Sequence, residues 1–172
     1  ALKEVQELLG DSPRSRDLLI EALHLIQDRY HYLAAKHVVA LAHEFKLAPT
    51  EVFEVATFYH HFDVIRENET PPPSLTVRVC DSMSCRMAGA ENLIEELDQK
   101  FDESVRVQRV PCVGRCQHAP VAVVGQNPVD LANPAKVKQK TELNDTIPSL
   151  PNYVDYNAYR NAGGYQVYQS CV

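Results

Sequence analysis

Two pairs of cysteines constrain the fold of this chain more than any other feature of its sequence. Four residues separate Cys80 from Cys85, three separate Cys112 from Cys116, and 26 residues lie between the pairs. Thiolate sulfur is a soft ligand that suits zinc or an iron-sulfur cluster and does not suit calcium or magnesium. We therefore expect a fold that brings two loops, distant in the sequence, to one four-thiolate site.

The composition indicates a folded protein rather than a disordered one. The chain has 172 residues, of which 45% are hydrophobic, and this is enough for one compact domain or two small ones. No apolar run approaches the roughly 18 residues of a membrane span, and the first residues do not resemble a signal peptide. We therefore expect a cytoplasmic protein without a membrane span, whose cysteines serve metal binding or thiol chemistry rather than disulfides.

Three amphipathic segments in the first 65 residues predict a small helical bundle. The first helix is expected from about residue 13 to residue 29, with Ser12 as its cap and Pro13 at its first helical position. The second lies within residues 33–45, and the third opens at Pro49 and continues to residue 62.

The charge of this region argues against nucleic-acid binding. The chain has a net charge of -6, and no Lys or Arg lies between Leu47 and Ile65, where Glu51, Glu54 and Asp63 are acidic. A helix that lies beside phosphates needs the opposite sign. We therefore set aside a helix-turn-helix DNA reader and expect protein or small-molecule partners.

A proline-rich stretch divides the chain, because Pro71, Pro72 and Pro73 have no backbone N–H and cannot continue a helix. The fold class that we expect is α+β. Its predicted parts are a helical bundle over 1–66, a linker over 67–74, a thioredoxin-like mixed-sheet domain over 75–141 and an extended tail over 142–172.

The second part shows the alternation of apolar and polar residues that is typical of strands. The helix that connects the first two strands predicts parallel pairing, and the short link to the third predicts an antiparallel hairpin. The expected strands lie within 74–80, 104–112 and 120–125, with a helix over 88–101 and a short closing helix over 133–140.

Both cysteine pairs follow the ends of predicted strands, so they should meet at one end of the sheet. Structural zinc sites favour pairs separated by two residues, whereas gaps of four and three suit a larger two-iron cluster with one pair for each iron. A thioredoxin-type dithiol enzyme would use a CxxC motif and would leave the second pair unexplained. We favour an iron-sulfur cluster and keep zinc as the alternative.

Three arginines flank the cysteines: Arg86, Arg109 and Arg115. A reduced cluster with four thiolates is strongly anionic, and cationic neighbours raise its reduction potential. We therefore expect these arginines to tune the cluster.

Four other residues that can bind metals have weaker claims. A Rieske-like site needs two histidines in place of cysteines, and four available thiols make this unnecessary. We expect no role for Cys171, which has no cysteine close to it in the sequence. The histidines set aside on these grounds are His60, His61 and His118.

With these features placed, the sequence resembles the small thioredoxin-like [2Fe-2S] ferredoxin of the NADH-dehydrogenase module of respiratory complex I. The similarity extends over roughly residues 14–140. It is carried by the segments "EVATFYHHF" (54–62), "VRVCDSMSC" (77–85), "GAENLIEEL" (89–97) and "VPCVGRCQHAPVAVVG" (110–125).

Two further segments resemble the diaphorase subunits of NAD-dependent formate dehydrogenases and NAD-reducing hydrogenases. These are "GQNPVD" (125–130) and "YVDYNAYRNAGGY" (153–165), the second of which is similar to the start of a flavoprotein domain. By this resemblance we expect the chain to be either the N-terminal module of such a fusion or a stand-alone form with a residual tail.

The resemblance implies an electron-transfer module of an NAD-linked oxidoreductase rather than a complete enzyme, with no full active site in this chain. It implies that a [2Fe-2S] cluster is bound by Cys80, Cys85, Cys112 and Cys116 and exchanges single electrons with FMN. FMN and NAD would bind only in an adjoining diaphorase domain or subunit, and other iron-sulfur subunits would be further partners. The alternative is a zinc-stabilised module that docks subunits and has no redox activity.

Overall fold

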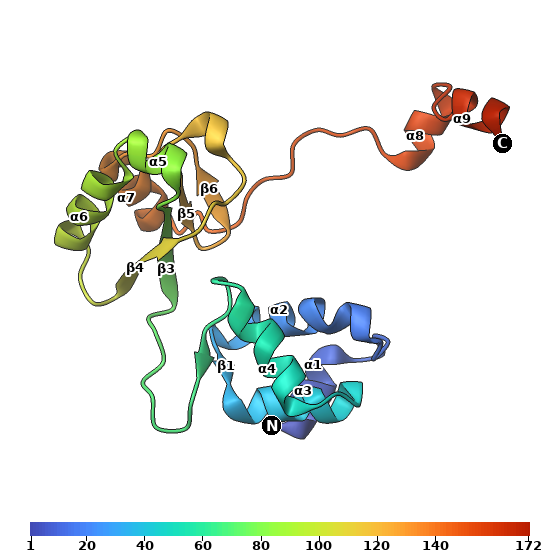
Figure 1. Cartoon of the computed structure of the whole chain (residues 1–172), viewed down its shortest axis with the longest axis horizontal. Coiled ribbons are helices and arrows are strands. Elements are labelled where there is room, and N and C mark those ends of the chain that lie inside the picture. The colour runs from blue at the N-terminus through green and yellow to red at the C-terminus, as the bar shows by residue number, and fades with distance from the viewer.

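Two separate hydrophobic cores organise the chain. The computed structural model describes residues 1–172. One core gathers buried side chains between Val5 and Phe62, and the other gathers those between Val77 and Val137. We call residues 1–65 the helical body and residues 75–147 the sheet body; Figure 1 shows both, with the C-terminal segment running away from them. The helices and the mixed sheet confirm the expected α+β class.

Four helices surround the core of the helical body. Leu23, Leu41 and Val52 point into this core from three different helices and are fully buried; burial of such a side chain contributes about 1.5–3 kcal/mol. The elements are α1 (Leu2–Leu9), α2 (Leu19–Tyr30), β1 (Leu33–Ala34), α3 (Ala35–Phe45), α4 (Pro49–Phe58) and β2 (Val64–Ile65), and the two short strands pair in parallel.

The expectation of a helix that starts at Pro13 is wrong. A 3-10 turn, η1 (Arg16–Leu18), precedes α2, and the additional helix α1 lies before that. The guanidinium of Arg14 donates hydrogen bonds to the carbonyl oxygens of Gly10 and Ser12 and also pairs with Glu44 of α3 at 3.5 Å. These contacts hold the chain around Ser12 and Pro13 in a turn, so the polar residues there connect two helices instead of starting one.

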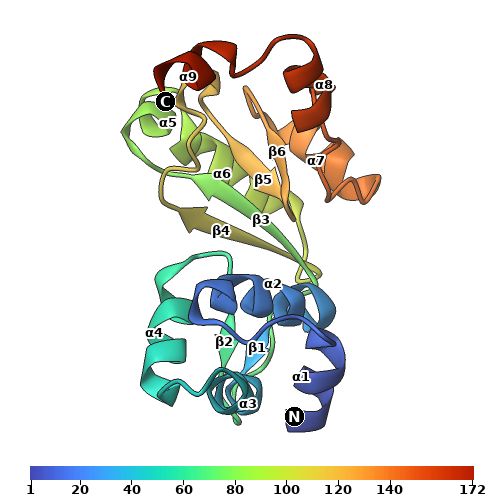
Figure 2. The same cartoon turned by 90° about the vertical axis from the view of Figure 1, so that its right-hand side faces the viewer.

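A four-stranded sheet with the order β4-β3-β5-β6 forms the sheet body. The helices α6 and α7 contact each other and the sheet, and they cover its apolar face (Figure 2). The elements are β3 (Leu75–Cys80), α5 (Met83–Met87), α6 (Ala90–Lys100), β4 (Val105–Val110), the 3-10 turn η2 (Cys116–His118), β5 (Ala122–Val124), β6 (Asn127–Val129) and α7 (Pro134–Glu142).

The pairing of the strands is partly as expected. The strands β3 and β4 are parallel, as the crossover helix predicts. The expected hairpin between β4 and β5 is wrong, because β5 pairs antiparallel with β3 and its hairpin partner is β6, a strand that the sequence pattern did not indicate. The loop that carries Cys112 and Cys116 takes the chain across to the far side of β3, and this separates β4 from β5.

The alternation along β3 decides what each face of the sheet contacts. Val77 and Val79 are fully buried in the sheet-body core, whereas Thr76 and Arg78 point to the opposite face. That face meets the helical body, which lies beside β3 and β4 in Figure 2. The contact between the bodies is therefore polar.

Arginine side chains make most of this contact. Arg78 donates to the carbonyl oxygens of His60 and His61, each at 3.2 Å, and to that of Gly125 at 3.1 Å. Arg106 forms a two-bond ion pair with Asp63, at 2.8 and 2.6 Å. The paired guanidinium groups therefore anchor the loop after α4 to the outer face of the sheet.

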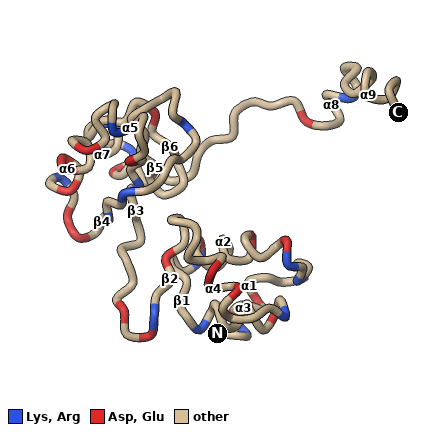
Figure 3. The backbone as a smooth tube through the Cα atoms, viewed as in Figure 1, with Lys and Arg blue, Asp and Glu red and all other residues tan.

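The segment after the sheet body lies apart from both cores. It contains two short helices, α8 (Tyr156–Asn161) and α9 (Gln166–Cys171), and nearly all of its side chains are exposed. Figure 3 shows few charged positions in this segment, where Asp155 and Arg160 are the only charged residues after residue 147. None of the helices in the structure has the length and apolar character that crossing a membrane requires.

Replacing Arg78 by Met should loosen the contact between the two bodies. The change removes three charge-assisted hydrogen bonds, and we expect the free energy of unfolding to fall by about 1.5–3 kcal/mol. Urea denaturation followed by circular dichroism measures this. The matched control is Lys100→Met, which removes an exposed pair with Glu96 (3.5 Å) and should change the free energy by less than about 0.5 kcal/mol. Equal effects of the two substitutions would contradict the assigned role of Arg78.

Candidate metal centre

The parallel pairing of β3 with β4 places the ends of both strands at the same edge of the sheet. Cys80 is the last residue of β3 and lies opposite Val110, the last residue of β4. Cys112 follows two residues later, and Cys116 begins η2. Cys85 lies in α5, immediately after the turn that leaves β3. The topology therefore brings all four cysteines to one edge.

The four sulfurs are arranged as two close pairs. The Sγ atoms of Cys112 and Cys116 are 3.3 Å apart, and Cys80 and Cys85 are close enough for each thiol to shift the pKa of the other. The two pairs also interact electrostatically, since a negative charge on Cys116 raises the pKa of Cys85. No three of the sulfurs lie within 4.8 Å of one another.

Backbone N–H groups surround the sulfurs. Burial alone raises the pKa of Cys80, but the N–H of Ser82, the thiol of Cys85 and the N–H of Val113 together outweigh it and lower that pKa. Burial and the Cys80 thiol raise the pKa of Cys85 to about 11. One member of the inner pair therefore favours the thiolate while its partner keeps a proton, and a bound metal would displace that proton.

The inner and outer pairs differ in their access to solvent. Cys80 and Cys85 are 1% and 2% exposed, whereas Cys112 and Cys116 are both at the surface. Gly114 lies between the outer two with φ at 77°, a backbone conformation that a residue with a Cβ rarely adopts, and its N–H donates to the Cys112 sulfur at 3.4 Å. The loop can thus wrap closely over the outer sulfurs.

Each of the three flanking arginines has a carboxylate partner. Each positive charge beside the thiols is therefore accompanied by a negative one. That these arginines tune the reduction potential of a cluster stays a prediction. Sequence inspection missed these partners, since they come from other elements. The pairs are Arg86 with Asp81 at 3.0 Å, Arg109 with Glu91 at 2.6 Å and Arg115 with Asp130 at 2.5 Å.

The remaining candidate residues lie in different surroundings. Cys171 is an exposed free thiol in α9. His118 is 43% exposed, and its Nε2 is 3.9 Å from the carboxylate of Asp130. His60 and His61 lie in the loop after α4, where His61 stacks against His24, a residue that sequence inspection passed over.

The arrangement of sulfurs fits a two-iron cluster better than a single zinc ion. Four thiolates around zinc, each about 2.3 Å from the metal, lie about 3.8 Å from one another. Here the outer pair, Cys112 and Cys116, has such a short spacing at 3.3 Å, and no three of the sulfurs lie mutually within 4.8 Å. Two pairs set apart match a cluster in which each iron takes two cysteines, and N–H donors toward sulfur suit its negative charge.

Comparison with known proteins agrees with this chemistry. The sequence model of the thioredoxin-like [2Fe-2S] ferredoxin family matches residues 5–143. A NADH-quinone oxidoreductase subunit of Aquifex aeolicus is 27% identical over 153 residues, which are 84% of this chain and 89% of that protein. A NADH-quinone oxidoreductase subunit of Thermus thermophilus is 29% identical over 122 residues, 66% of this chain and 65% of its own length.

A solved structure of an NAD+-reducing [NiFe]-hydrogenase in its H2-reduced state also matches, with a TM-score of 0.57 and 26% identity over 79% of this chain. This chain spans about a quarter (24%) of the hydrogenase chain that it matches. The resemblances read from the sequence, to the complex I type of subunit and to NAD-reducing hydrogenases, are thus confirmed. The chain belongs to the thioredoxin-like [2Fe-2S] ferredoxin family, whose cofactor is a [2Fe-2S] cluster.

Proposed function

We propose that Cys80, Cys85, Cys112 and Cys116 hold the [2Fe-2S] cluster and that the chain carries single electrons within a larger NAD-linked oxidoreductase. The observation that supports this most strongly is the gathering of two thiol pairs at one edge of the sheet. The names of the similar proteins, subunits of NADH-quinone oxidoreductases and an NAD+-reducing hydrogenase, support the setting.

When bound, the cluster accepts and releases one electron at a time. The chain supplies position and surroundings. The inner thiols of Cys80 and Cys85 are enclosed by the sheet-body core, which excludes water. The outer thiols of Cys112 and Cys116 face solvent, on the side from which an electron can enter or leave. The N–H of Gly114 holds the Cys112 sulfur in place.

The exposed side of α5, the helix that carries Cys85, suits a docked partner. Met83 and Met87 of α5 are 78% and 84% exposed, and Cys85 lies between them in the sequence. Exposed flexible apolar side chains of this kind are typical of contact surfaces. We propose that a flavin- and NAD-binding domain or subunit covers this side, exchanges electrons between its FMN and the cluster, and is joined by further iron-sulfur subunits.

For the complex as a whole we propose the NAD-dependent formate dehydrogenase or NAD-reducing hydrogenase type, located in the cytoplasm. The segment 125–130 and the tail over 153–165 support this through their similarity to diaphorase subunits. We propose that the substrate is oxidised elsewhere in the complex, as the resemblance to an electron-transfer module implies. The alternative, a zinc-stabilised docking module, is disfavoured because no three of the sulfurs lie within 4.8 Å of one another.

Metal analysis of anaerobically purified protein tests the proposal. We expect iron and acid-labile sulfide in equal amounts, an electron paramagnetic resonance signal after reduction with dithionite, and reduction by NADH only when the flavin-containing partner is added. One zinc ion per chain bound by the cysteines, with no sulfide, would favour the docking module instead.

Serine substitutions test the ligand set. Cys85→Ser and Cys112→Ser should each lose most of the bound iron, because a hydroxyl is a harder and less readily ionised ligand than a thiol. Iron content and visible absorbance per chain measure the loss. Cys171→Ser is the matched control and should keep the full iron content. Full iron content together with an unchanged visible spectrum in the Cys112→Ser protein would exclude this residue as a ligand.

The ion pair of Arg115 with Asp130 should affect the reduction potential in opposite directions when each partner is removed. Reduction adds negative charge, so Arg115→Gln, which leaves the carboxylate uncompensated, should lower the potential, whereas Asp130→Asn should raise it. A redox titration followed by paramagnetic resonance measures both. Arg29→Gln, in the helical body, is the control. Shifts of the same sign in both variants would mean that the pair acts on the loop's shape rather than through charge.

A further inference from the structure

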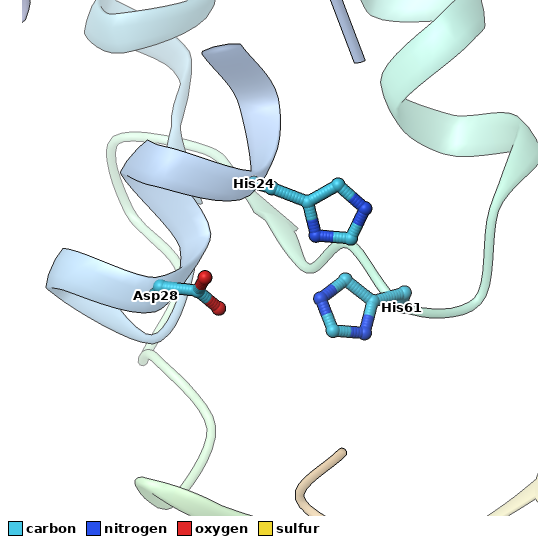
Figure 4. Close-up of side chains that lie close together, drawn as sticks. All are labelled: His24, Asp28 and His61. Atoms are coloured by element: carbon cyan, nitrogen blue, oxygen red, sulfur yellow. The ribbon is translucent and has the colours of Figure 1, made fainter. Parts of the chain in front are cut away.

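Three side chains able to bind a metal converge at the boundary between the two bodies, away from the cysteines. His24 and Asp28 lie one turn apart on the same face of α2, and His61 comes from the loop after α4. One ligand atom from each lies within 4.8 Å of the others. Figure 4 shows a ring nitrogen of each histidine and the carboxylate of Asp28 facing the same space.

The imidazole rings of His24 and His61 do not form a hydrogen bond with each other. Their centroids are 4.7 Å apart and their planes are tilted by 42°, so the rings are in contact, but no hydrogen bond joins them. The Nε2 atom of His61, which points toward Asp28 in Figure 4, is shielded from solvent and has no hydrogen-bond partner. A buried ring nitrogen without a partner in this position can be satisfied by a hydrogen bond or, through its lone pair, by a metal ion.

The surroundings favour a neutral His61. Burial first, and then the positive charge of Arg78, lower the pKa of His61 to about 4. Arg78 keeps its positive charge and opposes a cation placed nearby, while its N–H groups are directed toward three carbonyl oxygens. The carboxylates of Asp28 and Asp63 act in the opposite direction. The group therefore offers two imidazoles and one carboxylate to a metal ion, and Arg78 is the positively charged side chain that acts on it.

A cavity adjoins the group. It has a volume of about 550 Å³, lies between the bodies, and is lined by both Asp28 and His61. Gln126, from the turn between β5 and β6, also lines it and donates a hydrogen bond to Asp28 at 2.9 Å. Water from the cavity can fill coordination positions that the protein leaves open, and the bond from Gln126 orients the carboxylate as outer partners of metal ligands do.

We propose that His24, Asp28 and His61 bind one divalent transition-metal ion of the zinc class. Two imidazoles and one carboxylate form a ligand set typical of zinc, with a fourth position left to water, whereas magnesium and calcium prefer oxygen ligands throughout. The ion joins α2 to the loop after α4. Through Gln126 it also fixes the helical body against the sheet body. The site does not depend on the function proposed for the cysteines.

Zinc titration of the cluster-loaded protein tests the proposal. Occupied cysteines keep added zinc away from the thiols, and constant visible absorbance during the titration verifies this. Competition with a chromophoric zinc chelator, in the presence of millimolar magnesium, measures the affinity. We expect one zinc ion per chain, bound at least about tenfold more weakly after His24→Gln or Asp28→Asn, since loss of even an outer partner costs about 10–100-fold.

His43→Gln is the matched control, because His43 is 71% exposed in the same body and lies outside the group. Its affinity for zinc should equal that of the unchanged protein. Zinc should also slow proteolysis within residues 66–74 in the unchanged protein and in His43→Gln. It should not do so in His24→Gln or Asp28→Asn. Asp28 is exposed, so Asp28→Asn should fold normally and decides the question if His24→Gln does not. Equal zinc affinity in the unchanged protein and Asp28→Asn would overturn the proposal.

Discussion

The parallel register between β3 and β4 is the constraint on which the rest of the structure depends. It aligns Cys80 with Val110, and so brings the loop after each strand to the same edge of the sheet. The crossover through α6 makes this pairing parallel, and the apolar face of α6 is buried against the strands that it connects. The thiols meet because of contacts made far from them, in a core that contains no metal ligand beyond the inner two cysteines.

Much of this was open to prediction because it rests on periodicity. Alternating valines in β3 and the crossover helix were enough to predict a parallel pair, and the cysteines that follow each strand were enough to predict one site. What escaped prediction depends on contacts between distant residues. The turn around Pro13 is held by Arg14 and Glu44, 30 residues apart, and no local pattern shows this. The placement of β5 beside β3 likewise depends on which edge the cysteine loop crosses.

The same limit applies to the sites. Cysteine spacing predicts a ligand set. The carboxylates beside Arg109 and Arg115 come from α6 and from beyond β6, so the pairing of these arginines cannot be predicted from their neighbours in the sequence. His24 and His61 looked unremarkable one at a time, since 36 residues separate them. Only the packing of α2 against the loop after α4 places them in contact.

The inner thiols are enclosed and the outer ones are exposed, so the dielectric environment changes from one end of the cysteine site to the other. Water screens charge strongly around Cys112 and Cys116, which are exposed, and weakly around Cys80 and Cys85, which are buried. The cysteine site therefore has one end that is shielded from water and one end that is open to it. The hydrophobic core encloses the inner pair of thiols, and the loop around Gly114 carries the outer pair at the surface.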